Sequence, residues 1–260
     1  MHPINLINQL IKLMGCIMAK QIKDSEETKR KIIHAAKSEF ANKGFNGARM
    51  SSIASLAGVN QALLHYHFES KENLYISIFH YFIGDSSTKF AEKIDAEIDS
   101  WNTALDIKLC AIIYFLIGIH FESHDDDMNR IFAREIAEGT GMLHDFVKKY
   151  MLPRLLIIEN LIKEGVKAGI FEISNPKMFT INILTFITDF IHGEEFFKDT
   201  EWHDELFKNK RETLYNYMVE QSFKTLRPSK KELKIPQLDK EKMKKMDSFV
   251  KMINDFMSQV

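Results

Sequence analysis

Ten residues near the start of the chain have types and spacings suited to contacts with a nucleic acid. Gln61 has an amide that can pair bidentately with adenine, and Leu63 can meet a thymine methyl group. Arg49 and Lys71 are cationic, and hydroxyl or imidazole groups lie close by in the sequence to hydrogen-bond phosphate oxygens. The full set of expected DNA contacts is Arg49, Ser51, Ser52, Asn60, Gln61, Ala62, Leu63, His65, Tyr66 and Lys71.

A second group of residues has the spacing of a metal site. His120 and His124 stand four residues apart and precede Asp125, Asp126 and Asp127. On one helix face they would place imidazoles and carboxylates together, as a metal requires. A solvated helix end explains the same residues, so we expect no metal. Since the sequence also lacks a Walker loop, a dinucleotide fingerprint and a nucleophile elbow, it predicts no catalytic residues, no cofactor and no enzyme.

A third group could line a pocket for a small molecule. Ligand sites are mostly apolar and contain a few placed polar groups. Asp189 and His192 stand beside phenylalanines near the end of a predicted helix, and could select such a ligand. We therefore expect an unknown, apolar effector to contact Phe121, Phe132, Phe186, Asp189 and His192. The competing interpretation is that these phenylalanines fill an ordinary core.

The elements that position these residues should all be helices. Only 11 glycines and 5 prolines occur in 260 residues, which argues against many short strands joined by tight turns. Hydrophobic residues make up 45% of the chain and charged residues 27%, as in a folded domain rather than a disordered one. Two distant cysteines give neither a disulfide framework nor a zinc knuckle. We predict an all-α protein.

The first helices have clear start and stop signals. Asp24 and Glu27 resemble a capping box for a helix over 25–43, which Gly44 would end in a left-handed conformation. Helices are expected over 51–57, over 60–67 with Asn60 as its N-cap, and from Lys71 onward after Ser70. The second and third are joined by about three residues around Gly58, which is the spacing of a helix-turn-helix.

From about Lys29 to Tyr75 the chain resembles the N-terminal domain of the tetracycline-repressor (TetR) family. The resemblance is carried by KRKIIHAAKSEFANKGFNGARM, SSIASLAGVN and QALLHYHFESKENLY. It implies a transcriptional regulator, most simply a repressor, in which a homodimer reads a palindromic operator on double-stranded DNA and a small molecule releases it. The family often has Thr or Ser where Arg49 and Met50 stand, so we expect Ser51 or Ser52 to cap the second helix and Arg49 to reach a phosphate.

The rest of the chain reads as long helices without a motif. They are expected over 71–97, 101–122, 127–139, 142–169, 176–192 and 204–226, followed by a basic linker and an amphipathic tail helix. Two of them, 176–192 and 204–226, have the apolar content to form a dimeric four-helix bundle. The tail helix could dock on the body, across the dimer or on a membrane surface; we favour docking on protein.

The predicted organisation is an N-terminal extension (1–20), a DNA-binding domain (21–75), an effector-binding and dimerisation domain (76–226) and the tail (227–260). Residues 1–75 contain 10 basic and 6 acidic residues, and 227–260 contain 9 and 5, so the acidic middle leaves a net charge of −1. A basic front can approach a polyanion. No signal peptide or membrane span is evident, so we expect a cytoplasmic protein with no membrane partner. An effector-independent or architectural DNA-binding protein is the chief alternative.

Overall fold

The computed structural model describes residues 3–122, 125–226 and 235–259, and every element in these ranges is helical. The chain divides into two compact units. Unit 1 consists of residues 1–82 and 125–144, and unit 2 of residues 83–124 and 145–260. The boundary predicted at residue 75 falls inside a helix, and a segment from the middle of the chain belongs to unit 1. The all-α prediction is confirmed.

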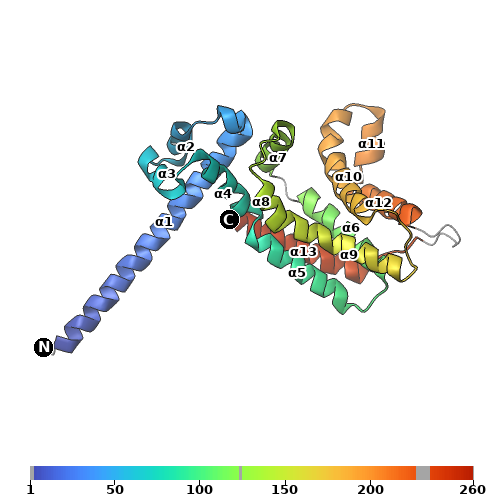
Figure 1. The fold of residues 1–260 in the computed structure, drawn as a ribbon, viewed down its shortest axis with the longest axis horizontal. Coiled ribbons are helices and arrows are strands. Elements are labelled where there is room, and N and C mark those ends of the chain that lie inside the picture. The colour runs from blue at the N-terminus through green and yellow to red at the C-terminus, as the bar shows by residue number, and fades with distance from the viewer. Residues whose placement is uncertain (1–2, 123–124, 227–234, 260) are drawn as a thin grey trace. The chain divides into compact units, whose positions relative to one another are not determined.

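Unit 1 contains a long helix that carries the shorter ones (Figure 1). Its helices are α1 (Pro3–Gly47), α2 (Met50–Ala57), α3 (Gln61–Phe68), α4 (Lys71–Ile83) and α7 (Asp126–Glu138). The core contains Ile32, Phe40 and Phe79, all almost fully buried, and α2 and α7 both pack on α1. The apolar stripe of α1 therefore organises the unit.

One predicted helix limit in unit 1 differs from the structure and another agrees with it. The capping box at Asp24 and Glu27 is wrong, because α1 is already helical from Pro3, and the carbonyl of Asp24 accepts a side-chain hydrogen bond from the Thr28 hydroxyl at 2.8 Å. A cap operates only where the preceding chain is not helical, and residues 16–23 contain no Gly or Pro to break the helix. The predicted interruption at Gly44 is confirmed by its φ of 68°.

The helix predicted over 71–97 is two helices. Gly84, with φ −63° and ψ −130°, separates α4 from α5 (Asp85–Ser100). Glycine adopts this backbone conformation without the penalty that a Cβ would impose. The break coincides with the limit of unit 1, so a single residue separates the helices of the two units.

Unit 2 is a bundle built around one central helix. That helix is α6 (Leu105–Glu122), which contacts α9, α10, α12 and α13 and is apolar on nearly every face. A helix that is apolar all round belongs in a core. The other elements are α8 (His144–Phe146), a π-helical turn η1 (Val147–Met151), α9 (Leu152–Lys167), α10 (Pro176–Phe197), α11 (Glu201–Phe207), α12 (Lys210–Leu226) and α13 (Lys240–Gln259).

The tail helix α13 docks on the body of unit 2, which is the first of the three alternatives that the sequence left open. Met246 and Val250 are fully buried, and Asp247 pairs with Arg211 of α12 and accepts a hydrogen bond from the Tyr114 hydroxyl at 3.2 Å. Gly118 allows this close approach, since a Cβ there would lie 2.9 Å from Val250. The tail is therefore part of the unit 2 core.

Candidate nucleic-acid interface

Helices α2 and α3 form a helix-turn-helix whose turn has the expected chemistry. Gly58 adopts φ 67° and ψ 32°, a left-handed conformation that glycine tolerates at no steric cost. The amide of Val59 donates to the carbonyl of Ala54 at 3.0 Å, which closes the turn. Asn60 caps α3 by accepting from the amide of Leu63 at 2.7 Å. The predicted turn and N-cap are confirmed.

Helix α3 has one buried face and one open face. Leu64 and Phe68 anchor it in the core, whereas Gln61, Ala62, His65 and Tyr66 are exposed and Leu63 is half-buried. Tyr66 has 78% of its surface exposed. The Gln61 amide lies 3.5 Å from the His65 ring, so these two side chains share one polar edge. The structure thus brings together the residues predicted to read base edges and leaves them accessible.

The first turn of α2 differs from the prediction. The N-cap residue is Arg49, whose side chain makes no capping bond, and Ser51 and Ser52 lie within the helix. Neither serine caps α2. The N-cap amide of Arg49 instead donates to the carboxylate of Glu39, from α1, at 3.4 Å. The sequence signal for Glu39 was its place on the stripe of Ile32 and Ala36, where a carboxylate needs a partner.

Lys71 lies at the start of α4, close to the end of α1. Its ammonium group donates to the carbonyl of Asn46 at 3.5 Å and lies 4.7 Å from the centre of the Phe45 ring. The hydroxyl of Ser70 caps α4 by accepting from the amide of Asn73 at 3.0 Å. These contacts hold the Lys71 side chain on the surface of unit 1 with its charge partly exposed.

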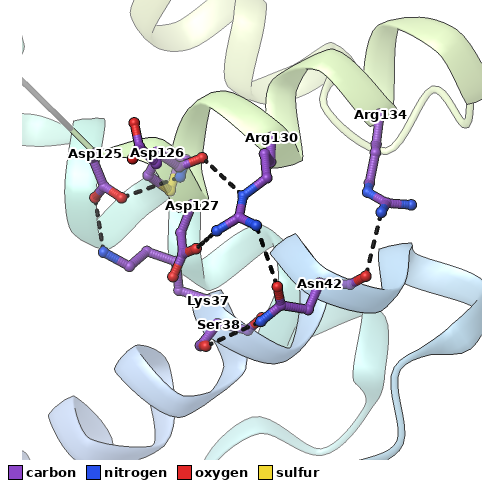
Figure 2. Close-up of polar contacts among 9 residues, drawn as sticks. Lys37, Ser38, Asn42, Asp125, Asp126, Asp127, Arg130 and Arg134 are labelled. Carbon is purple, nitrogen blue, oxygen red and sulfur yellow. Dashed lines mark hydrogen bonds and ion pairs between the residues drawn. The ribbon is translucent and has the colours of Figure 1, made fainter.

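Helix α7 supports α1 through a set of polar contacts (Figure 2). Lys37 pairs with Asp125 at 2.8 Å, and Arg130 donates to the side chain of Asn42 at 3.3 Å. Arg134 donates to the backbone carbonyl of Asn42, also at 3.3 Å. These bonds join segments about 90 residues apart in the sequence, so α7 is part of the unit that carries the helix-turn-helix.

An aromatic contact and a buried hydroxyl complete this support. Phe132 of α7 packs edge-to-face on Phe79 of α4 with ring centres 5.1 Å apart. The Tyr75 hydroxyl donates to Glu135 at 3.2 Å, and burial together with that carboxylate raises the pKa of Tyr75 well above its usual range. Tyr75 therefore stays protonated and acts as a hydrogen-bond donor.

The residues predicted to bind an effector do not all lie in one unit. Phe132 belongs to unit 1, where it packs on Phe79, and the other four residues belong to unit 2. In unit 2, Phe121 packs partly buried against the core, with the Lys210 ammonium 5.4 Å from its ring centre. Asp189 and His192 are exposed on α10, and Phe186 is exposed and stacks on Tyr217 at 5.3 Å.

The residues considered for a metal have other partners. Asp125 caps α7 by accepting from the amide of Met128 at 3.1 Å, and Asp127 pairs with Arg130 at 2.6 Å. The Nδ1 of His120 lies 2.8 Å from the carbonyl of Leu116, and burial lowers the pKa of the ring. His124 lies outside the described residues. In residues 3–122, 125–226 and 235–259, no three His, Cys, Asp or Glu side chains are grouped to bind a metal.

A helix-turn-helix with an open recognition face, carried by a unit separate from a larger helical bundle, defines a DNA-binding transcriptional regulator. Residues 32–78 match the profile of "Bacterial regulatory proteins, tetR family". Residues 32–78 therefore form a DNA-binding domain of the TetR family of transcriptional regulators, which is not a family of enzymes. The resemblance seen in the sequence is thereby confirmed.

Curated relatives and solved structures agree with this assignment. The chain is 26% identical over 140 residues to the fatty acid metabolism regulator protein of Bacillus subtilis, covering 53% of this chain and 68% of that protein. It is 30% identical over 153 residues to the transcriptional regulator RutR of Escherichia coli K12, covering 55% and 65%. The match therefore spans about two thirds of each relative.

Among solved structures, the regulator FadR of Bacillus subtilis in complex with stearoyl-CoA shares the fold. It is 19% identical, with a TM-score of 0.53 over 73% of this chain and 97% of that one. A TetR regulator from Haloarcula marismortui gives a TM-score of 0.53 at 16% identity, over 78% and 100%. Within the described part of the chain, no helix is both long enough and apolar enough to cross a bilayer.

Proposed function

We propose that this protein is a repressor that binds a palindromic operator as a homodimer and is released by a small apolar effector. The open face of α3 carries the DNA-binding part of the proposal. Gln61 and Leu63 read base edges there, with Ala62 giving the backbone room to approach. Phosphates are contacted by residues at the start of α2, in α3 with its N-cap, and at the start of α4: Arg49, Ser51, Ser52, Asn60, His65, Tyr66 and Lys71.

The test of DNA binding is selection of duplexes from a random-sequence library by the full-length protein. A symmetric dimer should select two half-sites one helical turn apart, about 34–36 Å. Gln61→Ala should relax the preference at one base pair per half-site by about 1–3 kcal/mol, whereas Lys71→Ala should weaken binding to all sequences. A selected site without symmetry, or one that Gln61→Ala leaves unchanged, would contradict the corresponding assignment.

An exposed apolar stripe on unit 2 supports the dimer. Met178, Ile181 and Phe196 are 65%, 43% and 87% exposed along α10, and Tyr217 of α12 is 45% exposed beside Phe186. Large exposed apolar side chains on neighbouring helices are typical of an interface. The helix expected over 204–226 is divided between α11 and α12. We therefore assign α10 and α12 to a four-helix bundle with the second copy.

Light scattering at micromolar concentration tests the dimer. The wild type should have twice the mass of one chain, and Ile181→Asp should shift it toward one chain because an unpaired carboxylate would be buried between the copies. Ile136, 82% exposed on α7 of unit 1, provides a matched control, since Ile136→Asp should leave the mass unchanged. A monomeric wild type would refute the assignment.

The proposed effector site lies in unit 2, around Phe121, Phe186, Asp189 and His192. The FadR structure of Bacillus subtilis holds stearoyl-CoA, which makes a long-chain acyl-CoA the first compound to test. A ligand that binds the native state raises its melting temperature, and coupling requires that it bind the DNA-incompetent state more tightly. We expect stearoyl-CoA to stabilise the protein and to release a preformed protein–DNA complex.

One observation favours the alternative of an effector-independent DNA-binding protein. The α13 side chains Met246 and Val250 fill the bundle beside α6, so part of the interior is occupied by the chain itself. Compounds that neither shift the melting temperature nor change operator affinity would support this alternative. Binding without release of DNA would refute the release mechanism for those compounds.

A further inference from the structure

We propose that Glu39 is a positioning residue for DNA binding. Its buried carboxylate holds the first turn of α2 so that the side chain of Arg49 meets a phosphate of the operator. The inference rests on the proposed function, in which Arg49 contacts the DNA backbone.

Glu39 accepts three bonds, one from Lys43 on its own helix α1 and two from the start of α2. Its side chain is 5% exposed and accepts from the Lys43 ammonium at 2.9 Å. It accepts from the backbone amide of Arg49 at 3.4 Å and also from the hydroxyl of Ser52. Burial by itself would raise the pKa of Glu39, but the bonds from Lys43, Arg49 and Ser52 lower it below 4.5, so the carboxylate is ionised at neutral pH.

The arrangement divides a capping box between two helices. In a capping box, the third helical residue carries a Glu or Gln that reaches back to the N-cap amide. In α2 that third residue is Ser52, which is too short to do so and instead donates to Glu39. A carboxylate from another helix thus bonds both the N-cap amide and the third residue. This fixes the α2 entry relative to α1 and orients the two side chains next to the DNA-binding face.

Charge and position act in opposite directions here, which makes the role testable. Removing a carboxylate near DNA makes the protein more positive and should tighten binding by simple electrostatics. Losing the position of Arg49 should weaken binding. A variant at Glu39 that binds more weakly despite its extra positive charge therefore reports positioning rather than charge.

The chain offers a matched control for the charge. Glu27 and Lys31 form an ion pair of 2.8 Å on the same helix with the same four-residue spacing, but both side chains are about half exposed. Glu27→Met and Glu27→Gln remove the same charge as the corresponding Glu39 variants without touching α2. Glu39→Met removes both acceptor oxygens, whereas Glu39→Gln keeps one, so the pair separates acceptor from charge.

The experiment measures affinity by fluorescence anisotropy from 50 to 200 mM salt. The probe is a fluorescein-labelled duplex carrying the site that the full-length protein selects from a random library. Each phosphate contact contributes about 0.9 to the slope of log affinity against log salt. We expect Glu39→Met to lower the slope by about 0.9 for each helix-turn-helix in the dimer, as Arg49→Ala does. Glu39→Gln should lower the slope by less than Glu39→Met. Both Glu27 variants should keep the wild-type slope.

The slope separates positioning from loss of folded protein, because a smaller folded fraction shifts all affinities equally. If Glu39→Met does not fold, Glu39→Gln, which keeps one of the two acceptor oxygens, carries the test with the same expected direction and a smaller effect. A Glu39→Met slope and affinity equal to those of Glu27→Met would overturn the inference while leaving the function intact. If Arg49→Ala also keeps the wild-type slope, Arg49 does not contact a phosphate, and that assignment in the proposed function is refuted as well.

Discussion

The N-cap of the recognition helix gives a prediction in which stability and DNA binding separate. Asn60 accepts from the amide of Leu63 at 2.7 Å, and α3 has only eight residues, Gln61 to Phe68. Replacing an N-cap Asn by Ala costs about 1 kcal/mol, with a range of about 0.5–2. Because α3 is so short, most of this cost should appear as a larger equilibrium constant for local unfolding of α3. A cost of about 1 kcal/mol raises that constant about fivefold.

The assay is amide hydrogen exchange of the peptide that covers α3, together with operator affinity. Asn60→Ala should speed exchange in α3 about fivefold and weaken DNA binding, because the reading face spends less time formed. Asn60→Asp should keep the exchange rate near that of the wild type, since Asp caps as well as Asn, and yet weaken binding through its negative charge beside the phosphates.

Asn175 is the matched control in unit 2. It caps α10 in the same way, accepting from the amide of Met178 at 3.1 Å. Asn175→Ala should speed exchange at the start of α10 without changing exchange in α3. Unchanged α3 exchange in Asn60→Ala, with faster exchange in Asn175→Ala, would show that the cap does not hold the recognition helix and would refute the reasoning.

Three further predictions concern the bundle and the support of α1. Gly118→Ala should destabilise the docking of α13 by about 1–3 kcal/mol, because its Cβ would lie 2.9 Å from a side-chain atom of α13. Gly193→Ala, with its nearest neighbour 3.9 Å away, should instead stabilise α10 by up to about 1 kcal/mol; thermal unfolding compares the two, and equal effects would contradict the packing argument. Burial lowers the pKa of His120, so the contribution of its neutral ring to the free energy of unfolding should be complete above the ordinary pKa of 6.5 and be lost as the pH falls below that value. Chemical denaturation between pH 8 and pH 5 should show this loss of stability, and His120→Gln should make the loss smaller. Tyr75→Phe removes the hydrogen bond to Glu135 and should destabilise the packing of α7 by about 1 kcal/mol, which should speed amide exchange in α7. The matched change Tyr217→Phe, at an exposed tyrosine, should leave that exchange unchanged.

The local elements of the DNA-binding unit could be predicted from the sequence because their signals are local. Gly58 supplies the positive φ of the turn, Asn60 the cap of α3, and the apolar spacing of Leu64 and Phe68 the buried face. Each depends on residues within one or two helical turns. The interruption at Gly44 followed from the same kind of evidence.

The predictions that needed correction depended on neighbours elsewhere in the chain. Asp24 has the right chemistry for a cap, but the helix already extends through it from Pro3. A serine was expected to cap α2, whereas the acceptor is Glu39 on another helix.

The sequence by itself determined the all-α class, the turn between α2 and α3, and the exposed face of α3, since 3.6-residue periodicity and capping act over short distances. The tertiary structure alone decided that α7 joins α1, through Lys37–Asp125 and the bonds to Asn42, and that Glu39 holds α2. These contacts join separate helices, in the case of α7 across about 90 residues of chain. They form because a carboxylate or cation taken from water must find a partner wherever the packing of the helices places one.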